Sequence, residues 1–218
     1  MVSPVAADLL ERWTRLAGPA SESVGRDLIG RWSEPHRAYH DVAHLRAVLD
    51  AVDLLAEHAV DPTAVRLAAW FHDAVYEGAA GADEKASAAL AEGVLPSVGV
   101  PPPRAAEVAR LVRLTAGHDP EPGDADGAVL CDADLAVLGS DPGGYAAYVA
   151  AVRREYAAVP DEVFRVGRAA VLERLLGLDP LYRTATARRL WADRAAANLR
   201  AELDRLRGGV SGGEGRPR

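Results

Sequence analysis

Histidine and carboxylate side chains gather in one stretch of this sequence, between Pro35 and Tyr76. Five of the chain's six histidines lie there, and an aspartate follows the last of them. Four of these histidines cluster near the two ends of the stretch, and with the aspartate they are the candidates: His36, His40, His44, His72 and Asp73. Imidazole and carboxylate groups are the usual protein ligands of Zn, Fe, Mn and Ni. The stretch therefore predicts a metal-centred site built between helices.

The spacing of these side chains indicates which of them can act together. His40 and His44 are four residues apart, so both lie on one face if their segment is helical. His72 shares its helical face with small apolar residues, and a buried imidazole there needs a partner such as a metal ion. On a regular helix Asp73 points about 100° away from His72. The two can share an ion only if it lies between their directions, unless a second ion binds Asp73.

Further candidates follow later in the chain. Asp132 and Asp134 stand in an apolar run, where ionised carboxylates need compensation. They are two residues apart and cannot both face the same way on a regular helix, so we expect at least one to be a ligand. His118 lies toward a buried face near a helix end, and with Asp119 it forms a second His-Asp doublet.

Helical periodicity supplies the elements that must position these groups. Apolar residues recur at helical spacing, and the alternation typical of strands is absent. We expect helices over residues 5–16, 23–32, 40–55, 62–72, 84–94, 104–118, 142–156, 162–176 and 182–206, with a short apolar segment over 128–138. The predicted fold class is all-α, a single bundle of about nine to ten helices over residues 1–207. The Gly-rich, charged segment 208–218 is predicted to be a disordered tail.

Charge and composition exclude several classes of partner. The 218 residues carry 32 acidic and 25 basic side chains, a net charge of −7. Duplex nucleic acid would need a basic footprint, whereas a small phosphorylated substrate needs only a local metal or a few arginines. The single cysteine, Cys131, excludes an internal disulfide and fits a reducing cytoplasm. No segment resembles a signal peptide or approaches the roughly 20 apolar residues of a membrane span, so we expect a cytoplasmic protein.

Taken together, His44, the doublet His72-Asp73 and Asp134 resemble the metal-binding signature of the HD superfamily of all-α metal-dependent phosphohydrolases. The similarity covers about residues 36–138, and residues 145–183 resemble one uncharacterised branch of predicted HD phosphohydrolases. The resemblance implies that these four side chains hold a divalent ion, which would be Mn, Mg, Co, Ni, Zn or Fe. The Ala-Asp-Leu at 133–135 resembles the late aspartate motif of that superfamily and favours Asp134 over Asp132.

The segment 39–44 also resembles the cyclic-nucleotide phosphodiesterases, in which the first histidine of such a pair is a general acid. By that analogy His40 protonates a leaving oxygen and His44 binds metal. The chain is short for those enzymes, so cyclic nucleotides are not implied. Glu84 is expected to orient the attacking water, directly or through another group. The expected second-metal or phosphate contacts are His118, Lys85, Arg153 and Arg183.

The expected function is hydrolysis of a phosphate ester of a small metabolite or nucleotide by metal-activated water. Two alternatives stay open. A di-iron HD-type oxygenase would need further histidine ligands between the doublet and the late aspartate, where the sequence offers only His118. A non-catalytic HD module would keep the metal site for folding or ligand sensing. The oligomeric state also stays open, a homodimer included.

Overall fold

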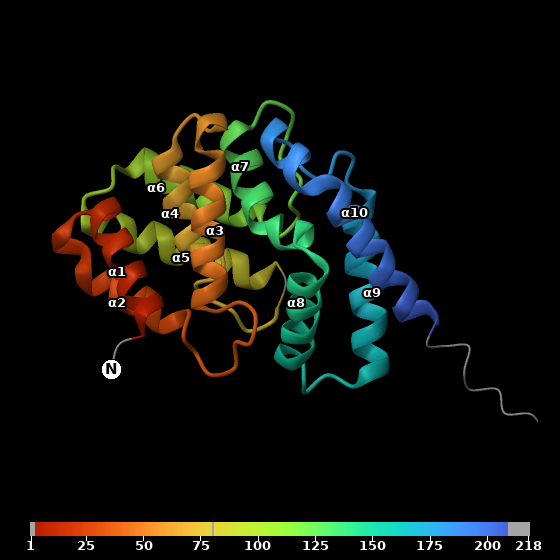
Figure 1. The fold of residues 1–218 in the computed structure, drawn as a ribbon. Coiled ribbons are helices and arrows are strands. Elements are labelled where there is room, and N and C mark those ends of the chain that lie inside the picture. Colours follow the sequence, from red (N-terminus) through yellow and green to blue (C-terminus); the bar gives the residue numbers. More distant parts are fainter. Residues whose placement is uncertain (1–2, 80, 209–218) are drawn as a thin grey trace, which may run out of the picture. The chain divides into compact units, whose positions relative to one another are not determined.

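The computed structural model describes residues 3–79 and 81–208, and within them every regular element is helical (Figure 1). These residues form ten α-helices, four short 3-10 segments and no strand, which confirms the predicted all-α fold. Residues 209–218 of the predicted tail lie outside the described part, and Gly208 is the last residue of the final helix. The chain divides into two compact units, Met1–Asp134 and Leu135–Arg218. The single-domain assignment for 1–207 stays a prediction.

The first unit contains seven of the α-helices. They are α1 (Pro4–Ala17), α2 (Glu22–Arg31), α3 (Val42–Leu55), α4 (Pro62–Phe71), α5 (Ala82–Val94), α6 (Pro102–Leu114) and α7 (Ala125–Asp134), with 3-10 segments at Pro19–Ser21, Ala56–His58 and Leu95–Val98. The helix α4 packs against α3, α5, α6 and α7. Seven of its ten residues are buried, because it is apolar on nearly every side. It is the central helix of this unit.

Aspartate caps begin the two helices that lead to the histidine ligands. Asp41 Oδ1 accepts hydrogen bonds from the backbone N–H groups of Ala43 (2.8 Å) and His44 (3.1 Å) at the start of α3. Asp61 caps α4 in the same way, with Pro at the first helical position. The start predicted at Asp61 is therefore confirmed, and each cap satisfies N–H groups that a helix leaves unpaired.

Two helices end earlier than their apolar pattern predicts. The pattern carries one helix through His72, but α4 ends at Phe71, and His72 is its C-cap. The other was expected to reach His118, but α6 ends at Leu114 and a turn follows. His118 has a φ of 52°, in the left-handed region that L-residues rarely adopt. Both histidines thus lie just beyond the last helical residue or the turn after it, and only His72 keeps helical backbone angles.

The second unit consists of a 3-10 segment and three α-helices: Leu135–Gly139, α8 (Pro142–Glu155), α9 (Asp161–Gly177) and α10 (Ala185–Gly208). Its interior holds a buried ion pair, in which Arg168 Nε donates to Glu202 Oε1 at 2.8 Å. The hydroxyl of Tyr145 donates to the other carboxylate oxygen. These groups tie the three helices together, since α8, α9 and α10 each supply one of them.

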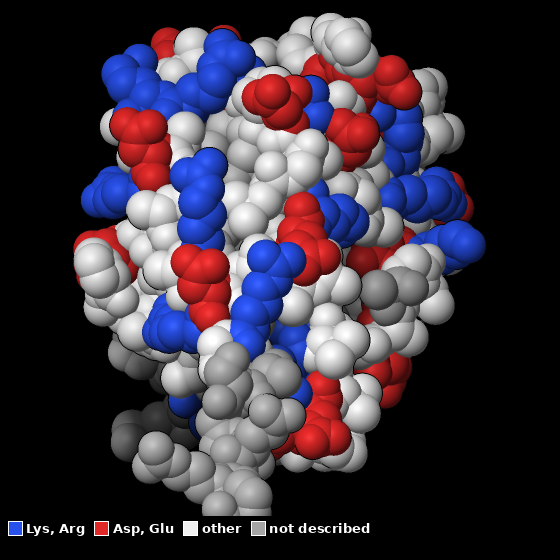
Figure 2. Space-filling model, turned by 90° about the vertical axis from the view of Figure 1, so that its right-hand side faces the viewer, with Lys and Arg blue, Asp and Glu red and all other residues white. Residues whose placement is uncertain are grey.

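The surface drawn in Figure 2 carries basic and acidic side chains interspersed with one another. In the second unit, Arg207 pairs with Glu173 and Arg153 pairs with Asp161. Within residues 3–79 and 81–208, none of the helices has the length and apolarity that a bilayer crossing requires.

Candidate metal centre

Three predicted ligands converge inside the first unit. His44 comes from the first turns of α3, His72 from the C-cap of α4 and Asp134 from the end of α7. His44 Nε2 lies 3.2 Å from His72 Nε2 and 3.1 Å from Asp134 Oδ1, and His72 Nε2 lies 3.5 Å from the same oxygen. In the described part of the chain, these three donate ligand atoms that all lie within 4.8 Å of one another. Two nitrogens and one carboxylate oxygen around one point are a donor set that suits a divalent transition metal.

Asp73 adjoins this group through His72. Its Oδ2 lies 3.3 Å from His72 Nε2. The residue before it, His72, still has helical backbone angles, with φ −56° and ψ −38°. Of the four predicted ligands, the structure therefore brings His44, His72 and Asp134 into one group and places Asp73 beside it.

The ring of His72 is oriented for metal binding by a backbone carbonyl. Its Nδ1 lies 2.8 Å from the oxygen of Ala69, which can only accept, so Nδ1 carries a proton and Nε2 faces the cluster. Burial alone would lower the pKa of His72, but the carboxylates of Asp73 and Asp134 outweigh it and raise the pKa to about 9. Without an ion, a second proton on this imidazole supplies positive charge between the two carboxylates.

His44 and Asp134 have the protonation states that binding of a metal ion would require. Burial lowers the pKa of His44, although its contact with Asp134 opposes that shift, so the imidazole stays neutral and keeps a lone pair. Burial would raise the pKa of Asp134, but the nearby His72 and hydrogen bonds from His118 and His44 hold it well below its usual value. The carboxylate is therefore ionised at neutral pH.

His118 contacts the second oxygen of the Asp134 carboxylate. The distance from its Nε2 to Oδ2 is 2.7 Å, so the imidazole donates to the ionised group. Its Nδ1 is buried and has no hydrogen-bond partner among the residues that the structure describes. One carboxylate oxygen thus faces His44 and His72, while the other is bound by His118. This geometry makes His118 a support of a candidate ligand; its predicted contact with a second metal or phosphate stays a prediction.

The predicted acid, His40, lies in the loop before α3, because the helix begins only after Asp41. His40 and His44 are therefore not one turn apart on a helix, yet their ring centroids are 5.6 Å apart. His40 Nε2 lies 4.0 Å from Asp73 Oδ2. The ring of Tyr76 stacks on His40 with centroids 4.4 Å apart. His40 is half-buried at the edge of the cluster, where a proton donor can meet a substrate.

The remaining predictions in the first unit fall on α5. Glu84 Oε2 accepts the backbone N–H of Gly81 at 2.5 Å, so this carboxylate caps the helix. Lys85 is exposed. The catalytic role of Glu84 and the phosphate contact of Lys85 stay predictions. Asp132, the alternative late ligand, is fully buried in α7 and is not part of the three-residue group.

The predicted phosphate-binding arginines of the second unit have structural contacts of their own. Arg153 links α8 to α9: its Nη1 donates to the oxygen of Tyr156 at 2.6 Å and its Nη2 pairs with Asp161 at 2.5 Å. Arg183 is half-buried in the segment between α9 and α10. Their roles as phosphate contacts stay predictions.

Three residues near the cluster were not singled out by the sequence pattern: Trp32, Arg37 and Tyr76. The ring of Trp32 lies 5.1 Å from that of His72, and its Nε1 donates to the oxygen of Trp70 at 3.0 Å. The Arg37 side chain is 0% exposed. Trp32 and Arg37 do lie close to His36 in the sequence, four residues before it and directly after it. The pattern did not single them out, because neither side chain is a usual metal ligand.

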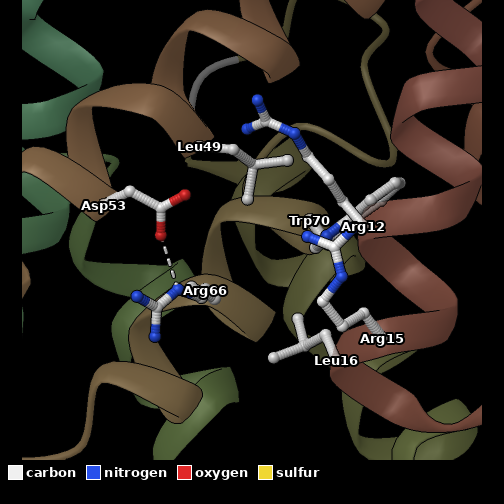
Figure 3. A pocket seen from close by; sticks show the side chains of 7 residues that line it. All are labelled: Arg12, Arg15, Leu16, Leu49, Asp53, Arg66 and Trp70. Atoms are coloured by element: carbon white, nitrogen blue, oxygen red, sulfur yellow. Dashed lines mark hydrogen bonds and ion pairs between the residues drawn. The ribbon is translucent and has the colours of Figure 1, made fainter.

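A cavity of about 330 Å³ also lies in the first unit, and none of its lining residues is a candidate ligand (Figure 3). It is lined by Arg12, Arg15, Leu16, Leu49, Asp53, Arg66 and Trp70. The guanidinium groups already pair with carboxylates: Arg66 with Asp53, Arg12 with Asp50 and Arg15 with Glu11. These ion pairs balance the positive charges of the arginines that line the cavity, and we assign it no role at the histidine cluster.

Comparison of this chain with protein-family models, curated proteins and solved structures finds no match.

Proposed function

We propose that this chain is a metal-dependent phosphohydrolase of the HD superfamily, acting on a phosphate ester of a small metabolite or nucleotide. One observation carries the proposal: His44, His72 and Asp134, from three separate helices, meet with their ligand atoms within 4.8 Å, and Asp73 adjoins them. Their order in the sequence is also the order of the HD signature that they resemble. A bound divalent ion would polarise a phosphoryl oxygen and lower the pKa of a bound water.

The chain's own residues divide the remaining tasks. His44 and His72 present neutral Nε2 atoms once the extra proton leaves His72, and Asp73 and Asp134 offset the charge of the ion. His118 holds the outer oxygen of Asp134 and thereby turns the inner one toward the ligands. His40, at the edge of the cluster, is placed to donate a proton to the leaving oxygen of the ester.

The alternatives differ in the ligands that they need. A di-iron oxygenase needs a second set of imidazoles, and between the His72-Asp73 doublet and Asp134 the sequence offers only His118. That ring is hydrogen-bonded to Asp134. A phosphohydrolase with one ion needs no further imidazoles beyond His44 and His72, whose grouping with Asp134 and the adjoining Asp73 supports this proposal.

The test combines metal analysis with a substrate panel. The protein is purified without chelator, its bound metal is determined by elemental analysis, and phosphate release from phosphorylated metabolites is measured with Mn²⁺, Mg²⁺, Co²⁺ or Ni²⁺. We expect one divalent ion per chain and phosphate release that Asp73→Ala and Asp134→Ala abolish. Asp119→Ala is the matched control, because Asp119 is the exposed aspartate of the second His-Asp doublet; it should keep wild-type activity.

Each other outcome points to a different function. Two irons per chain with oxygen uptake would replace the proposal with the oxygenase. A bound ion without turnover on the whole panel would favour a non-catalytic metal module. Loss of activity in Asp119→Ala, with activity retained in Asp73→Ala, would show that the wrong doublet has been assigned.

A further inference from the structure

Arg37 places a buried guanidinium between the two loops that carry His40 and Asp73. Its side chain is 0% exposed, and Nε pairs with Glu34 at 3.0 Å. Nη1 donates to the backbone oxygen of Asp73 at 2.7 Å and to that of His40 at 3.1 Å. Nη2 lies 3.5 Å from the oxygen of Ala74. A single nitrogen therefore joins the loop before α3 to the turn after α4.

Two aromatic rings hold this guanidinium and also contact the histidines. The Arg37 Cζ lies 5.4 Å from the ring centroid of Trp32 and 5.4 Å from that of Tyr76. The same Trp32 ring contacts His72, and the same Tyr76 ring stacks on His40. The cation is thus packed between the rings that border the proposed acid and a proposed ligand.

The planar guanidinium of Arg37 holds the backbone carbonyl groups that it binds at a fixed spacing. Its donors lie in a rigid fork, so the carbonyl oxygens that it binds cannot move apart independently. Those carbonyls belong to His40 and Asp73, whose side chains face each other with Nε2 and Oδ2 4.0 Å apart. A buried charge that lost these partners would be costly, which keeps the loop and the turn together.

We propose that Arg37 is a positioning residue, which sets the spacing between His40 and Asp73 by binding both of their backbone oxygens. The inference rests on the proposed function where it treats His40 as the acid and Asp73 as a ligand. Arg37 itself touches neither substrate nor ion. Its effect passes through the backbone to the geometry of the ligand turn.

The test compares Arg37→Met with Arg12→Met, which removes a partly buried, carboxylate-paired guanidinium of the same unit. In the metal-free protein, amide hydrogen exchange of residues 38–41 and 72–76 should rise together in Arg37→Met and stay at the wild-type level in Arg12→Met. The Kd for Mn²⁺ should rise about 10-fold in Arg37→Met, as for other groups that orient a ligand. With any substrate that the wild-type protein hydrolyses, the kcat of Arg37→Met should fall while its KM changes little.

Arg37→Lys keeps the positive charge but loses the planar set of N–H donors. Its amide hydrogen exchange and its Kd for Mn²⁺ should therefore lie between those of wild type and Arg37→Met. If Arg37→Met does not fold, Arg37→Lys carries the same measurements against wild type. Wild-type exchange in both segments, with an unchanged Kd, would overturn the proposal and leave Arg37 a purely structural group. A wild-type protein that binds no Mn²⁺ would count against the proposed function, while exchange in the metal-free chain would still decide the role of Arg37.

Discussion

At the scale of single residues, the two oxygens of Asp134 have different partners. Oδ1 faces His44 and His72, and Oδ2 accepts from His118. A carboxylate held in this way presents one oxygen to an ion without having to reorient. His118 adopts its left-handed φ of 52° in the turn after α6, and within residues 3–79 and 81–208 its buried Nδ1 has no hydrogen-bond partner. A strained backbone and an unpaired buried polar atom at the same residue are typical of residues at functional sites.

Replacement of His118 should weaken metal binding without removing a ligand. In His118→Ala and His118→Gly the Kd for Mn²⁺, measured by titration calorimetry, should rise about 10- to 100-fold, because Asp134 loses its orienting donor. The two variants should differ in stability, however. Glycine adopts positive φ freely, so His118→Gly should be more stable than His118→Ala by about 1 kcal/mol in urea unfolding. An Ala variant that binds Mn²⁺ as tightly as wild type would contradict the role of His118.

At the scale of elements, the candidate ligands lie at the ends of helices more than along their faces. His72 lies at the C-cap of α4 and Asp134 is the last residue of α7. The start of α4 is held by Asp61, whose carboxylate accepts N–H groups of the first turn and pairs with Arg104 at 2.7 Å. Since α4 is the central helix of its unit, its cap helps to set the position of His72.

Loss of the Asp61 cap should destabilise the first unit in a pH-dependent way. Asp61→Ala should lower the free energy of unfolding by about 1 kcal/mol at neutral pH. Burial alone would raise the pKa of Asp61, but the bonds from Arg104 and the helix N–H groups outweigh it and lower the pKa. A depressed pKa stabilises the fold above the unfolded value of about 3.9 and loses that contribution as pH falls through the folded pKa. The gap between wild type and variant should therefore shrink in urea melts below about pH 4.

Asp61→Asn is the matched control for the charge. The amide oxygen can still cap the helix, so most of the stability should remain. Its attraction to Arg104 and its titration are lost, so its stability should depend less on acid than that of wild type. An Asp61→Asn variant as unstable as Asp61→Ala would show that the ion pair, not the cap, holds the start of α4.

At the scale of the whole molecule, all four candidate ligands belong to the first unit, and they come from three places along it: α3, the turn after α4, and α7. An ion bound there would cross-link segments from residue 44 to residue 134. The Arg168–Glu202 pair of the second unit makes its hydrogen bonds without any of the four candidate ligands.

Metal should stabilise the folded chain by mass action. At a free Mn²⁺ concentration 100-fold above its Kd, the free energy of unfolding should rise by about 2.7 kcal/mol, and a chelator should reverse the gain. The gain should disappear in Asp134→Ala, as followed by thermal melts with and without Mn²⁺. An equal shift in wild type and Asp134→Ala would place the stabilising ion elsewhere.

Glu202→Ala provides a contrast in the second unit. The Arg168 side chain is 7% exposed and that of Glu202 is 4% exposed, so removal of one partner should cost about 3–5 kcal/mol. The Kd for Mn²⁺, measured at a temperature where the variant is folded, should equal that of wild type, because the second unit supplies none of the four ligands. Weakened Mn²⁺ binding in this variant would contradict the assignment of the whole centre to the first unit.

The sequence by itself determined the helical class and the kinds of residue at the candidate site. Helical periodicity and aspartate caps are local signals, which act over one or two turns and need no tertiary contact. The ligand types could likewise be recognised from the spacing of His44, His72, Asp73 and Asp134, which resembles the HD signature.

Only the tertiary structure decided how these side chains meet. Apolar periodicity did not predict that α4 ends at Phe71, because a helix end depends on the groups that satisfy its last backbone carbonyls. The division of the two Asp134 oxygens and the bonds of Arg37 to His40 and Asp73 join residues far apart in the sequence. Such contacts follow from packing, and no spacing rule encodes them.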